Sequence, residues 1–277
     1  MHEWPLLIFT VAVPSAIGGM LFLWFAQNML KKDSEIDLFS MMKLPLLTIA
    51  ILSIIGLFAS FFHLGKPIHA LNALRGLGSS WMSNEIVVTG LFIGLACLTV
   101  ALAFYQKKIN PALMLITGIV GLGDIFCMGQ LYSVTRVNGW DHINTFLVFY
   151  GTAFTLGPVL GASLLVASGH FEKLQRTINW AFVFSLFGVA IQIIGAAMLN
   201  GYVGEMHLID TVSAAEKLQS YGGMIGIRWI IESVGLIGLG YLALFPAKKN
   251  YTLIYAALAF FLIAEGMSRY VFYVLGA

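Results

Sequence analysis

The sequence predicts an all-α, polytopic integral membrane protein with eight transmembrane helices in a single domain that covers residues 1–277. Hydrophobic residues make up 59% of the chain and charged residues only 10%, and the mean hydropathy of +0.89 is well above that of soluble domains. A helix needs about 20 apolar residues to cross a hydrocarbon core of roughly 30 Å, so the chain has room for at most about eight spans with short connections. A separate soluble domain would not fit.

Eight apolar runs of membrane length follow one another along the chain. Helices are the expected structure because backbone polar groups in lipid must be satisfied within the segment that carries them. The runs are Leu6–Leu30, Leu44–Phe62, Ile86–Tyr105, Ala112–Tyr132, Thr145–Ser168, Ile178–Leu199, Ile225–Phe245 and Tyr251–Leu275. Eight such spans could pack as two four-helix bundles.

Prolines and aromatic residues mark the ends of these runs. Pro5 opens the first run, Asn110-Pro111 opens the fourth, and Pro246 closes the seventh. Amphipathic rings favour the membrane interface, and several lie near predicted helix ends: Trp4, Trp81, Tyr132, Trp140 and Tyr202.

The distribution of lysine and arginine predicts the orientation. The odd-numbered connections hold nine of them, namely Lys31, Lys32, Lys43, Lys107, Lys108, Lys173, Arg176, Lys248 and Lys249. The even-numbered connections hold four, namely Lys66, Arg75, Arg136 and Lys217. The positive-inside rule therefore places the odd connections in the cytoplasm and both termini outside. Two outer connections, His63–Glu85 and Asn200–Met224, are the longest in the protein, which suggests a docking surface on that side.

Charge and cysteine usage exclude several classes of protein. The net charge of +2 is small and scattered, so nucleic acid is not an expected partner. Cys97 and Cys127 both lie inside apolar runs, and we interpret them as small core residues rather than as a disulfide or metal ligands. The N-terminus has no basic segment and no cleavage site of small residues, so the first run is expected to remain as a span.

Ionisable side chains inside apolar spans are costly, and they are functional candidates because they usually face a bundle interior or water. They are Asp124 in the fourth run, Arg228 and Glu232 in the seventh, and Glu265 and Arg269 in the eighth. The members of each arginine–glutamate pair are spaced i, i+4 and therefore share a helix face. The alternative to a functional role is that the two charges of each pair simply neutralise each other. Asp124 is a weaker candidate because the adjacent Gly123 leaves space for a water or a backbone group to satisfy it.

A long polar stretch from Phe62 to Glu85 sets an imidazole and a carboxylate at neighbouring ends of the second and third runs. In the predicted orientation His63, Glu85, Arg228 and Arg269 all fall in the outer half of the membrane. We therefore expect a pocket for a small amphipathic ligand there. His63 suits a ligand that loses protons on oxidation, since its unperturbed pKa is about 6.5. Glu85, beside water at a helix start, is placed to pass a proton outward.

Both residues also have a simpler interpretation. His63 at a helix end is compatible with an ordinary hydrogen-bonding role at the membrane interface, and Glu85 with a first-turn carboxylate that stabilises the helix dipole. Haem is not expected, because bis-histidine haem needs axial ligands on facing helices, and His63 is the histidine of the six that adjoins a helix core. No metal site is expected in this protein.

Five segments carry a resemblance to a known family. They are HEWPL at His2–Leu6, HLGKPIHALNAL at His63–Leu74, SNEI at Ser83–Ile86, IGIRW around Arg228, and AEGMSRYVFY from Ala264 to Tyr273. Together they resemble the membrane-anchor subunit of bacterial dimethyl sulfoxide reductase, of the polysulfide reductase-like anchors, and the likeness runs from one end of the sequence to the other.

The resemblance implies a haem-free, multi-pass anchor subunit of an anaerobic respiratory complex in the bacterial inner membrane, with both termini periplasmic. Such an anchor binds and oxidises menaquinol near the outer face. It passes the electrons to an iron–sulfur subunit, which feeds a molybdopterin catalytic subunit that reduces dimethyl sulfoxide or a related S- or N-oxide. Iron–sulfur clusters and molybdopterin then lie only in the partner subunits.

The resemblance also implies roles for individual residues. The family's quinol-site histidine matches His63, and its acidic partner matches Glu85. Supporting roles are implied for residues that fall on family-like motifs, namely Arg228, Glu265 and Arg269. Asp124 and Glu232 match no family position, and the sequence assigns them no role.

Two other functions remain open at this point. The first is a small-solute transporter, which broken helices near the midplane would favour. Pro14 and Pro158 are the only prolines away from the ends of the predicted spans, and they lie away from Asp124 and the acid–base pairs. The second is a purely structural anchor without a quinol site, which binding of a quinol analogue would exclude.

Overall fold

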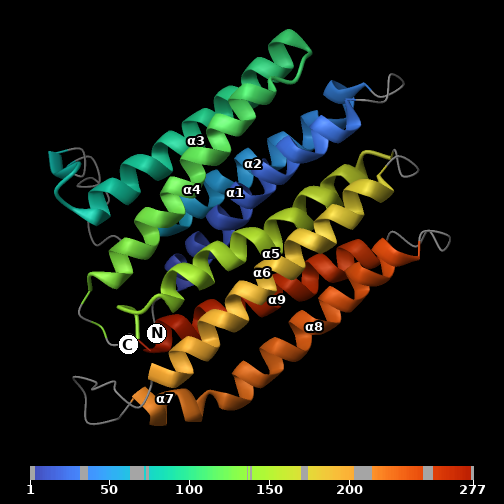
Figure 1. Ribbon diagram of the computed structural model, residues 1–277. Coiled ribbons are helices and arrows are strands. Elements are labelled where there is room, and N and C mark those ends of the chain that lie inside the picture. Colours follow the sequence, from blue (N-terminus) through green and yellow to red (C-terminus); the bar gives the residue numbers. More distant parts are fainter. Residues whose placement is uncertain are drawn as a thin grey trace.

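The computed structural model describes residues 4–31, 37–62, 72, 75–135, 137, 139–169, 174–202, 214–245 and 252–275. These residues form eight long apolar helices, which confirms the predicted all-α, polytopic fold (Figure 1). The long helices are α1 (Trp4–Leu30), α2 (Leu38–Phe61), α3 (Trp81–Gln106), α4 (Pro111–Ser133), α5 (Asn144–Ala167), α6 (Gln175–Tyr202), α8 (Gly222–Leu244) and α9 (Thr252–Leu275). A short helix, α7 (Ala214–Ser220), lies within a connection that we expected to be a loop.

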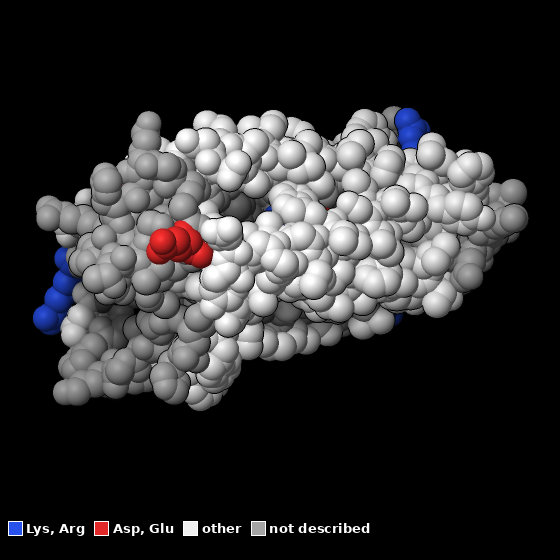
Figure 2. Space-filling view, turned by 90° about the horizontal axis from the view of Figure 1, so that it is seen from below, with Lys and Arg blue, Asp and Glu red and all other residues white. Residues whose placement is uncertain are grey.

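The surface of these helices suits a lipid environment. Large apolar side chains are exposed along them, for example Ile55 and Phe58 on α2 and Ile230 and Ile237 on α8. In the face shown in Figure 2, the middle is white apart from small patches of colour inside a hollow, and the large blue and red groups lie away from it. Exposed apolar belts of this kind are stable only when lipid covers them.

Most of the long helices begin slightly before their predicted apolar runs, and two of them, α2 and α3, begin five or more residues before. Helix α2 starts at Leu38 rather than Leu44, because Asp37 is an N-cap whose Oδ1 accepts a hydrogen bond of 3.1 Å from Phe39 N. As a result Pro45, the second residue of the predicted run, lies one third of the way along the helix rather than at its start. Helix α3 starts at Trp81 rather than Ile86, which makes Glu85 the fifth residue of a helix.

The long helices pack as two four-helix bundles, as the sequence suggested. In the first bundle α1 contacts α2 and α4, and α3 contacts α2 and α4. In the second bundle α5 contacts α6 and α9, and α8 contacts α6 and α9. The main contact between the bundles is that of α1 with α5. Both termini lie at the same end of the molecule, which we call the terminal end (Figure 1).

Glycines allow α1 and α5 to approach closely. A Cβ atom on Gly18 would collide with the backbone carbonyl oxygen of Ala153, and a Cβ on Gly157 would lie 2.5 Å from the carbonyl carbon of Gly18. Small residues at such positions let helix backbones pack in lipid, where no hydrophobic force drives association. The contact between the two bundles therefore depends on these glycines.

We expect Gly18→Ala to destabilise the protein by about 1–3 kcal/mol, because α1 and α5 must move apart to admit the methyl group. The thermal unfolding midpoint of the detergent-solubilised protein measures this effect. Gly94→Ala on α3 is the matched control, since a Cβ there meets no atom within 4 Å. It should leave the midpoint unchanged or raise it, because alanine is the better helix former. Equal midpoints for the two variants would contradict the proposed packing.

Candidate functional site

A pair of buried carboxylates lies in the first bundle. Glu85 on α3 is 7% exposed and Asp124 on α4 is fully buried, and the two are close enough for their charges to interact. Thr89, one turn after Glu85, donates a hydrogen bond of 2.7 Å to Asp124 Oδ1, while Asp124 Oδ2 has no partner among the described residues. Two buried carboxylates within electrostatic range of each other are unfavourable as like charges, so the pair is suited to holding and releasing a proton.

This geometry corrects the expected surroundings of Glu85. The carboxylate is not beside water at a helix start, because the first turn of α3 is formed by residues that we had assigned to the preceding loop. Asp124, which we had expected to be satisfied beside Gly123, instead accepts a hydrogen bond from Thr89 and lies within electrostatic range of Glu85.

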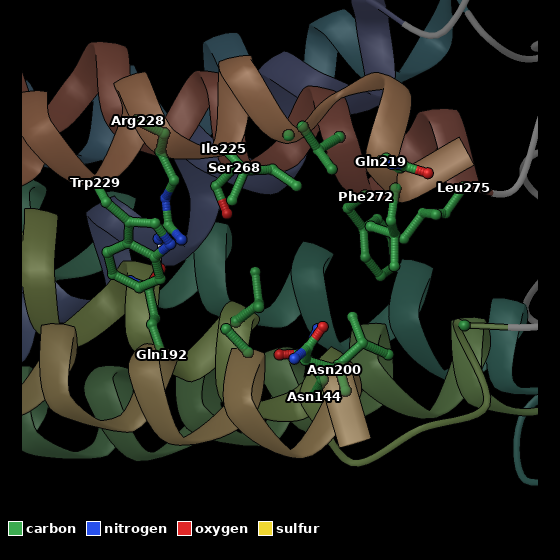
Figure 3. Close-up of a pocket in the computed structure, with 17 residues that line it drawn as sticks. Asn144, Gln192, Asn200, Gln219, Ile225, Arg228, Trp229, Ser268, Phe272 and Leu275 are labelled. Atoms are coloured by element: carbon green, nitrogen blue, oxygen red, sulfur yellow. Dashed lines mark hydrogen bonds between the residues drawn. The ribbon is translucent and has the colours of Figure 1, made fainter. Parts of the chain in front are cut away.

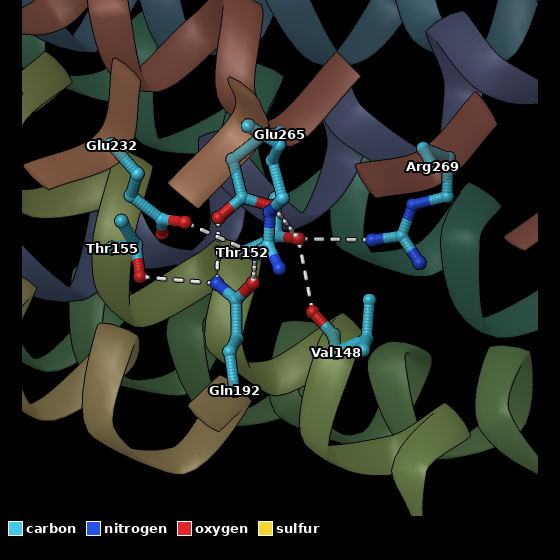
Figure 4. A network of polar contacts seen from close by, with 8 residues as sticks. Val148, Thr152, Thr155, Gln192, Glu232, Glu265 and Arg269 are labelled. Carbon is cyan, nitrogen blue, oxygen red and sulfur yellow. Dashed lines mark hydrogen bonds and ion pairs between the residues drawn. The ribbon is translucent and has the colours of Figure 1, made fainter. Parts of the chain in front are cut away.

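A second polar group occupies the centre of the second bundle (Figure 4). The carboxylate of Glu265 on α9 accepts hydrogen bonds at both oxygens. Gln192 Nε2 on α6 donates to Oε1 over 2.6 Å, and Thr152 Oγ1 on α5 donates to Oε2 over 2.7 Å. Gln192 Nε2 also lies 3.2 Å from Thr155 Oγ1. Glu265 is thus held by side chains from two other helices.

Two arginines complete this group. Arg228 Nη2 donates to Gln192 Oε1 and lies 3.2 Å from Glu232 Oε2, which confirms the predicted i, i+4 pair on α8. Arg269 Nη2 on α9 donates to Thr152 Oγ1 over 2.9 Å, and its guanidinium carbon lies 4.0 Å from the ring centre of Phe149. No direct ion pair between Glu265 and Arg269 occurs among the described residues, and Thr152 joins them instead.

The network contains two arginines and two glutamates, so its formal charges sum to zero. We call these residues, together with Gln192 and Thr152, the second-bundle network: Thr152, Gln192, Arg228, Glu232, Glu265 and Arg269. Balanced formal charge lowers the cost of burying two acidic and two basic side chains at membrane depth.

A cavity of about 560 Å³ leads from the terminal end of the second bundle to this network. Figure 3 shows Gln192, Arg228 and Trp229 at one end, and Gln219 and Leu275 toward the other. Two polar atoms of its lining residues, Arg228 Nε and Asn144 Oδ1, are buried without a hydrogen-bond partner among the described residues. Both atoms expose almost no surface, so they are packed within the bundle although other atoms of these residues line the cavity.

A chain of hydroxyl groups lies between the two bundles. Tyr132 Oη on α4 lies 2.7 Å from Tyr273 Oη on α9, which lies 3.2 Å from Thr10 Oγ1 on α1. Both tyrosines are within electrostatic range of Glu85 on one side and Arg269 on the other. The hydroxyl groups thus lie within electrostatic range of members of both polar groups.

The structure brings together only part of the site that we expected from the sequence. Arg228 and Arg269 share the second-bundle network, whereas Glu85 belongs to the carboxylate pair of the first bundle. His63 lies outside the described residues. The expected single pocket is therefore divided, among the described residues, into two polar groups joined by tyrosines.

Sequence reasoning missed most of the neutral partners in these groups. Gln192, Thr152 and Thr89 are uncharged residues inside apolar runs, where only ionisable residues were considered candidates. The single glutamine in the apolar run Ile178–Leu199 was an available signal, because a buried amide needs hydrogen-bond partners. Tyr132 was interpreted only as an interface residue, although its side chain is buried.

Comparison with known proteins gives matches along almost the whole sequence. A family model described as the DMSO reductase anchor subunit (DmsC) matches residues 1–275. A component of the anaerobic dimethyl sulfoxide reductase of Haemophilus influenzae is 30% identical over 279 residues, covering 99% of this protein and 94% of that one. The component of the same name from Escherichia coli is 30% identical over 281 residues, covering 98% and 94%.

A more distant similarity covers half of the sequence. A component of the sulfite dehydrogenase of Allochromatium vinosum is 27% identical over 155 residues, which cover 50% of this protein and 47% of that one. No solved structure matches the sequence.

Proposed function

The protein belongs to the family of DMSO reductase anchor subunits, and we propose that it is the haem-free, menaquinol-oxidising anchor of an anaerobic respiratory molybdoenzyme. Its partners would be an iron–sulfur electron-transfer subunit and a molybdopterin catalytic subunit, which carry the metal cofactors. The complex would reduce dimethyl sulfoxide or a related S- or N-oxide, as the names of the relatives suggest.

The observation that carries the quinol-oxidising role is the buried carboxylate pair near the terminal end. Oxidation of a quinol to a quinone releases two electrons and two protons, so a quinol site needs a proton acceptor. Glu85 and Asp124 supply carboxylates for this purpose, and Glu85 is only the fifth residue from the terminal end of α3. A general base must lie within hydrogen-bond reach of the proton that it accepts.

In the proposed reaction, menaquinol enters laterally from the lipid and its hydroxyl group donates a hydrogen bond to His63. The sequence places His63 just after α2 ends at Phe61, which is also at the terminal end. Protons leave through Glu85, and electrons pass to the iron–sulfur subunit docked at this end. The terminal end would face the periplasm, since the lysine-rich odd-numbered connections occupy the opposite end.

Arg228 and Arg269 have supporting roles in this proposal. Their guanidinium groups fix Gln192 and Thr152, which in turn hold Glu265, so they maintain the charge balance of the second bundle. The hydrogen-bonded hydroxyl groups of Tyr132 and Tyr273 interact electrostatically with both Glu85 and Arg269. In this proposal they couple a change in the charge of Glu85 to Arg269.

A small-solute transporter is the second candidate, and the cavity beside Arg228 is the observation that favours it. The cavity has the size of a ligand site, and polar residues such as Gln192, Asn200 and Arg228 are among those that line it. A purely structural anchor is the third candidate, and binding of a quinol analogue would exclude it.

Metal analysis of the native complex distinguishes these functions. The protein is purified from native membranes with a C-terminal tag, and iron and molybdenum are measured in the sample. We expect both metals in fixed ratio to the tagged protein, together with quenching of a fluorescent quinol analogue. If the tagged protein is folded but neither metal nor any partner co-purifies, the transporter becomes the better assignment.

A further inference from the structure

A second pocket lies at the end of the molecule opposite the terminal end, where α1 and α3 end and α2 and α4 begin (Figure 1). We call it the lysine pocket after three residues that line it, Lys31, Lys107 and Lys108. Its volume of about 320 Å³ is near the lower limit of small-molecule sites in proteins. Neither the carboxylate pair nor the second-bundle network contributes to its wall, so it needs an explanation of its own.

Positive charge dominates the wall of the lysine pocket. The three lysines are exposed, so their ammonium groups are accessible, and Asp37 is the one carboxylate among the described residues that line the pocket. The described part of the chain gives none of these lysines an ion-pair partner, and Asp37 caps α2 by accepting a hydrogen bond from Phe39 N. The wall therefore has a formal charge of +2.

The sequence around the pocket keeps this excess of positive charge. Residues 31–43 and 107–111 together hold five lysines and three acidic residues, which again leaves a formal charge of +2. The carboxylates of the connection between α1 and α2 are included in this count. An excess of cations at one place is stabilised by an anion from outside the chain.

The ring of Phe39 draws two of these cations together. Lys43 Nζ lies 5.7 Å and Lys107 Nζ lies 5.0 Å from the centre of this ring, which packs edge-on against Phe104 at the end of α3. An aromatic face attracts a cation but has no net charge, so it does not cancel the repulsion between two ammonium groups. A bound anion would cancel it.

Helix dipoles explain only some of the lysines. Lys31 and Lys107 follow the carboxyl ends of α1 and α3, where a cation is favourable. Lys43 lies in the second turn of α2, near the positive end of that helix, where a cation is unfavourable. First-turn residues of α2 and α4, such as Leu38 and Pro111, also line the pocket. The positive ends of two helix dipoles thus add to the attraction for an anion.

Apolar surface beside the pocket narrows the class of anion. Leu38, Phe39 and Ile109 are among the residues that line it. Next to Lys43 and Phe104, the side chains of Leu44 and Tyr105 are 58% and 86% exposed on the outer surface of α2 and α3. Lysines at the ends of membrane spans attract the phosphate groups of acidic lipids. A phospholipid therefore matches both the charge of the pocket and its apolar surroundings.

We propose that the lysine pocket binds the phosphate group of an acidic phospholipid, such as phosphatidylglycerol, from the leaflet at this end of the molecule. The phosphate oxygens accept hydrogen bonds from the ammonium groups of the three lysines, and the acyl chains lie along the exposed apolar surface of α2 and α3. A zwitterionic lipid has an ammonium group of its own and gains less from a positive pocket. The proposal is independent of the quinol-oxidising role of Glu85.

The test compares two lipids on the intact complex, purified in detergent and freed of lipid by washing. Phosphatidylglycerol and phosphatidylethanolamine with the same acyl chains are titrated in, and the bound copies are counted by native mass spectrometry. The variants are Lys107→Asn, Lys108→Gln and the double variant. Lys107 has a φ of 53°, which asparagine adopts readily, so Lys107→Asn keeps the end of α3. Arg176→Gln is the matched control, because Arg176 is an exposed cation at the same end of the molecule that does not line the pocket.

We expect the unaltered complex and Arg176→Gln to hold one copy of phosphatidylglycerol more tightly than any copy of phosphatidylethanolamine. The affinity of this copy should fall about fivefold in each single variant and about 25-fold in the double variant, and it should also fall at high salt. Phosphatidylglycerol should raise the unfolding midpoint of the unaltered complex and of Arg176→Gln, and raise it less in the double variant.

Three results would overturn the proposal. The first is equal retention of the two lipids by the unaltered complex. The second is an equal loss of phosphatidylglycerol in Arg176→Gln and in the double variant. The third is displacement of the lipid by inorganic phosphate at a similar concentration, which would assign the pocket to a soluble anion. If the double variant has a lowered midpoint before lipid is added, Lys108→Gln alone is compared with Arg176→Gln. None of these results would affect the proposed function, because quinol oxidation is not measured.

Discussion

Replacing Glu85 with glutamine is expected to slow menaquinol-driven reduction of dimethyl sulfoxide at least about 100-fold, the lower range of what a general base contributes. Glutamine keeps the size of the side chain and its capacity for hydrogen bonds, but it cannot accept a proton from the quinol. The same preparation should reduce dimethyl sulfoxide at the normal rate with reduced viologen, a soluble donor that bypasses the anchor. The ratio of the two rates is the measurement.

Glu216→Gln on α7 is the matched control, because this carboxylate is exposed and lies near the same end of the molecule. It should leave both rates unchanged. If Glu85→Gln keeps the menaquinol-driven rate, Glu85 is not the proton acceptor. If both rates fall together, the variant has impaired assembly of the complex, and the role of Glu85 is again not supported.

Asp124→Asn separates the contributions of the two carboxylates. Asparagine can still accept the hydrogen bond from Thr89, so the helix contact between α3 and α4 is kept. We expect a smaller loss than in Glu85→Gln, about tenfold, since Glu85 remains but has lost the neighbouring charge that shapes its proton affinity. A larger loss than in Glu85→Gln would make Asp124 the principal acceptor.

Length and apolar composition were enough to find all eight spans, because a membrane imposes both on any helix that crosses it. The starts of α2 and α3 were placed too late for a local reason. Their first turns contain polar residues such as Ser40 and Ser83, which interrupt the apolar runs although the helices have already begun. Asp37 could have located the first of these starts, since aspartate before a run is an N-cap signal.

The site was predicted less completely, because placement at the same membrane depth does not make residues neighbours. Glu85 and Arg228 both lie near the terminal end of their helices, yet α3 packs against α2 and α4, while α8 packs against α6 and α9. Only tertiary packing decides which residues at the same membrane depth become neighbours. The i, i+4 rule correctly joined Arg228 with Glu232, but it could not reveal that Thr152 from α5 stands between Glu265 and Arg269.

Arg269→Leu is expected to destabilise the protein by about 3–5 kcal/mol, the usual cost of removing one partner from a buried charge network. Arg269 is fully buried, so its loss would leave the negative charge of Glu265 with less compensation and Thr152 without its donor. The guanidinium contact with the Phe149 ring would also disappear. The midpoint of thermal unfolding in detergent measures the loss, and Arg176→Leu on the exposed start of α6 is the control.

The double variant Arg269→Leu/Glu265→Leu then tests whether charge balance is the cause. If the cost arises from an unpaired buried charge, removing Glu265 as well should recover part of the stability, because two apolar side chains replace two compensating ions. Additive losses would instead show that each residue acts through its own hydrogen bonds to Thr152 and Gln192. In that case Thr152→Val, which keeps the shape and removes the hydroxyl, should reproduce most of the effect of Arg269→Leu.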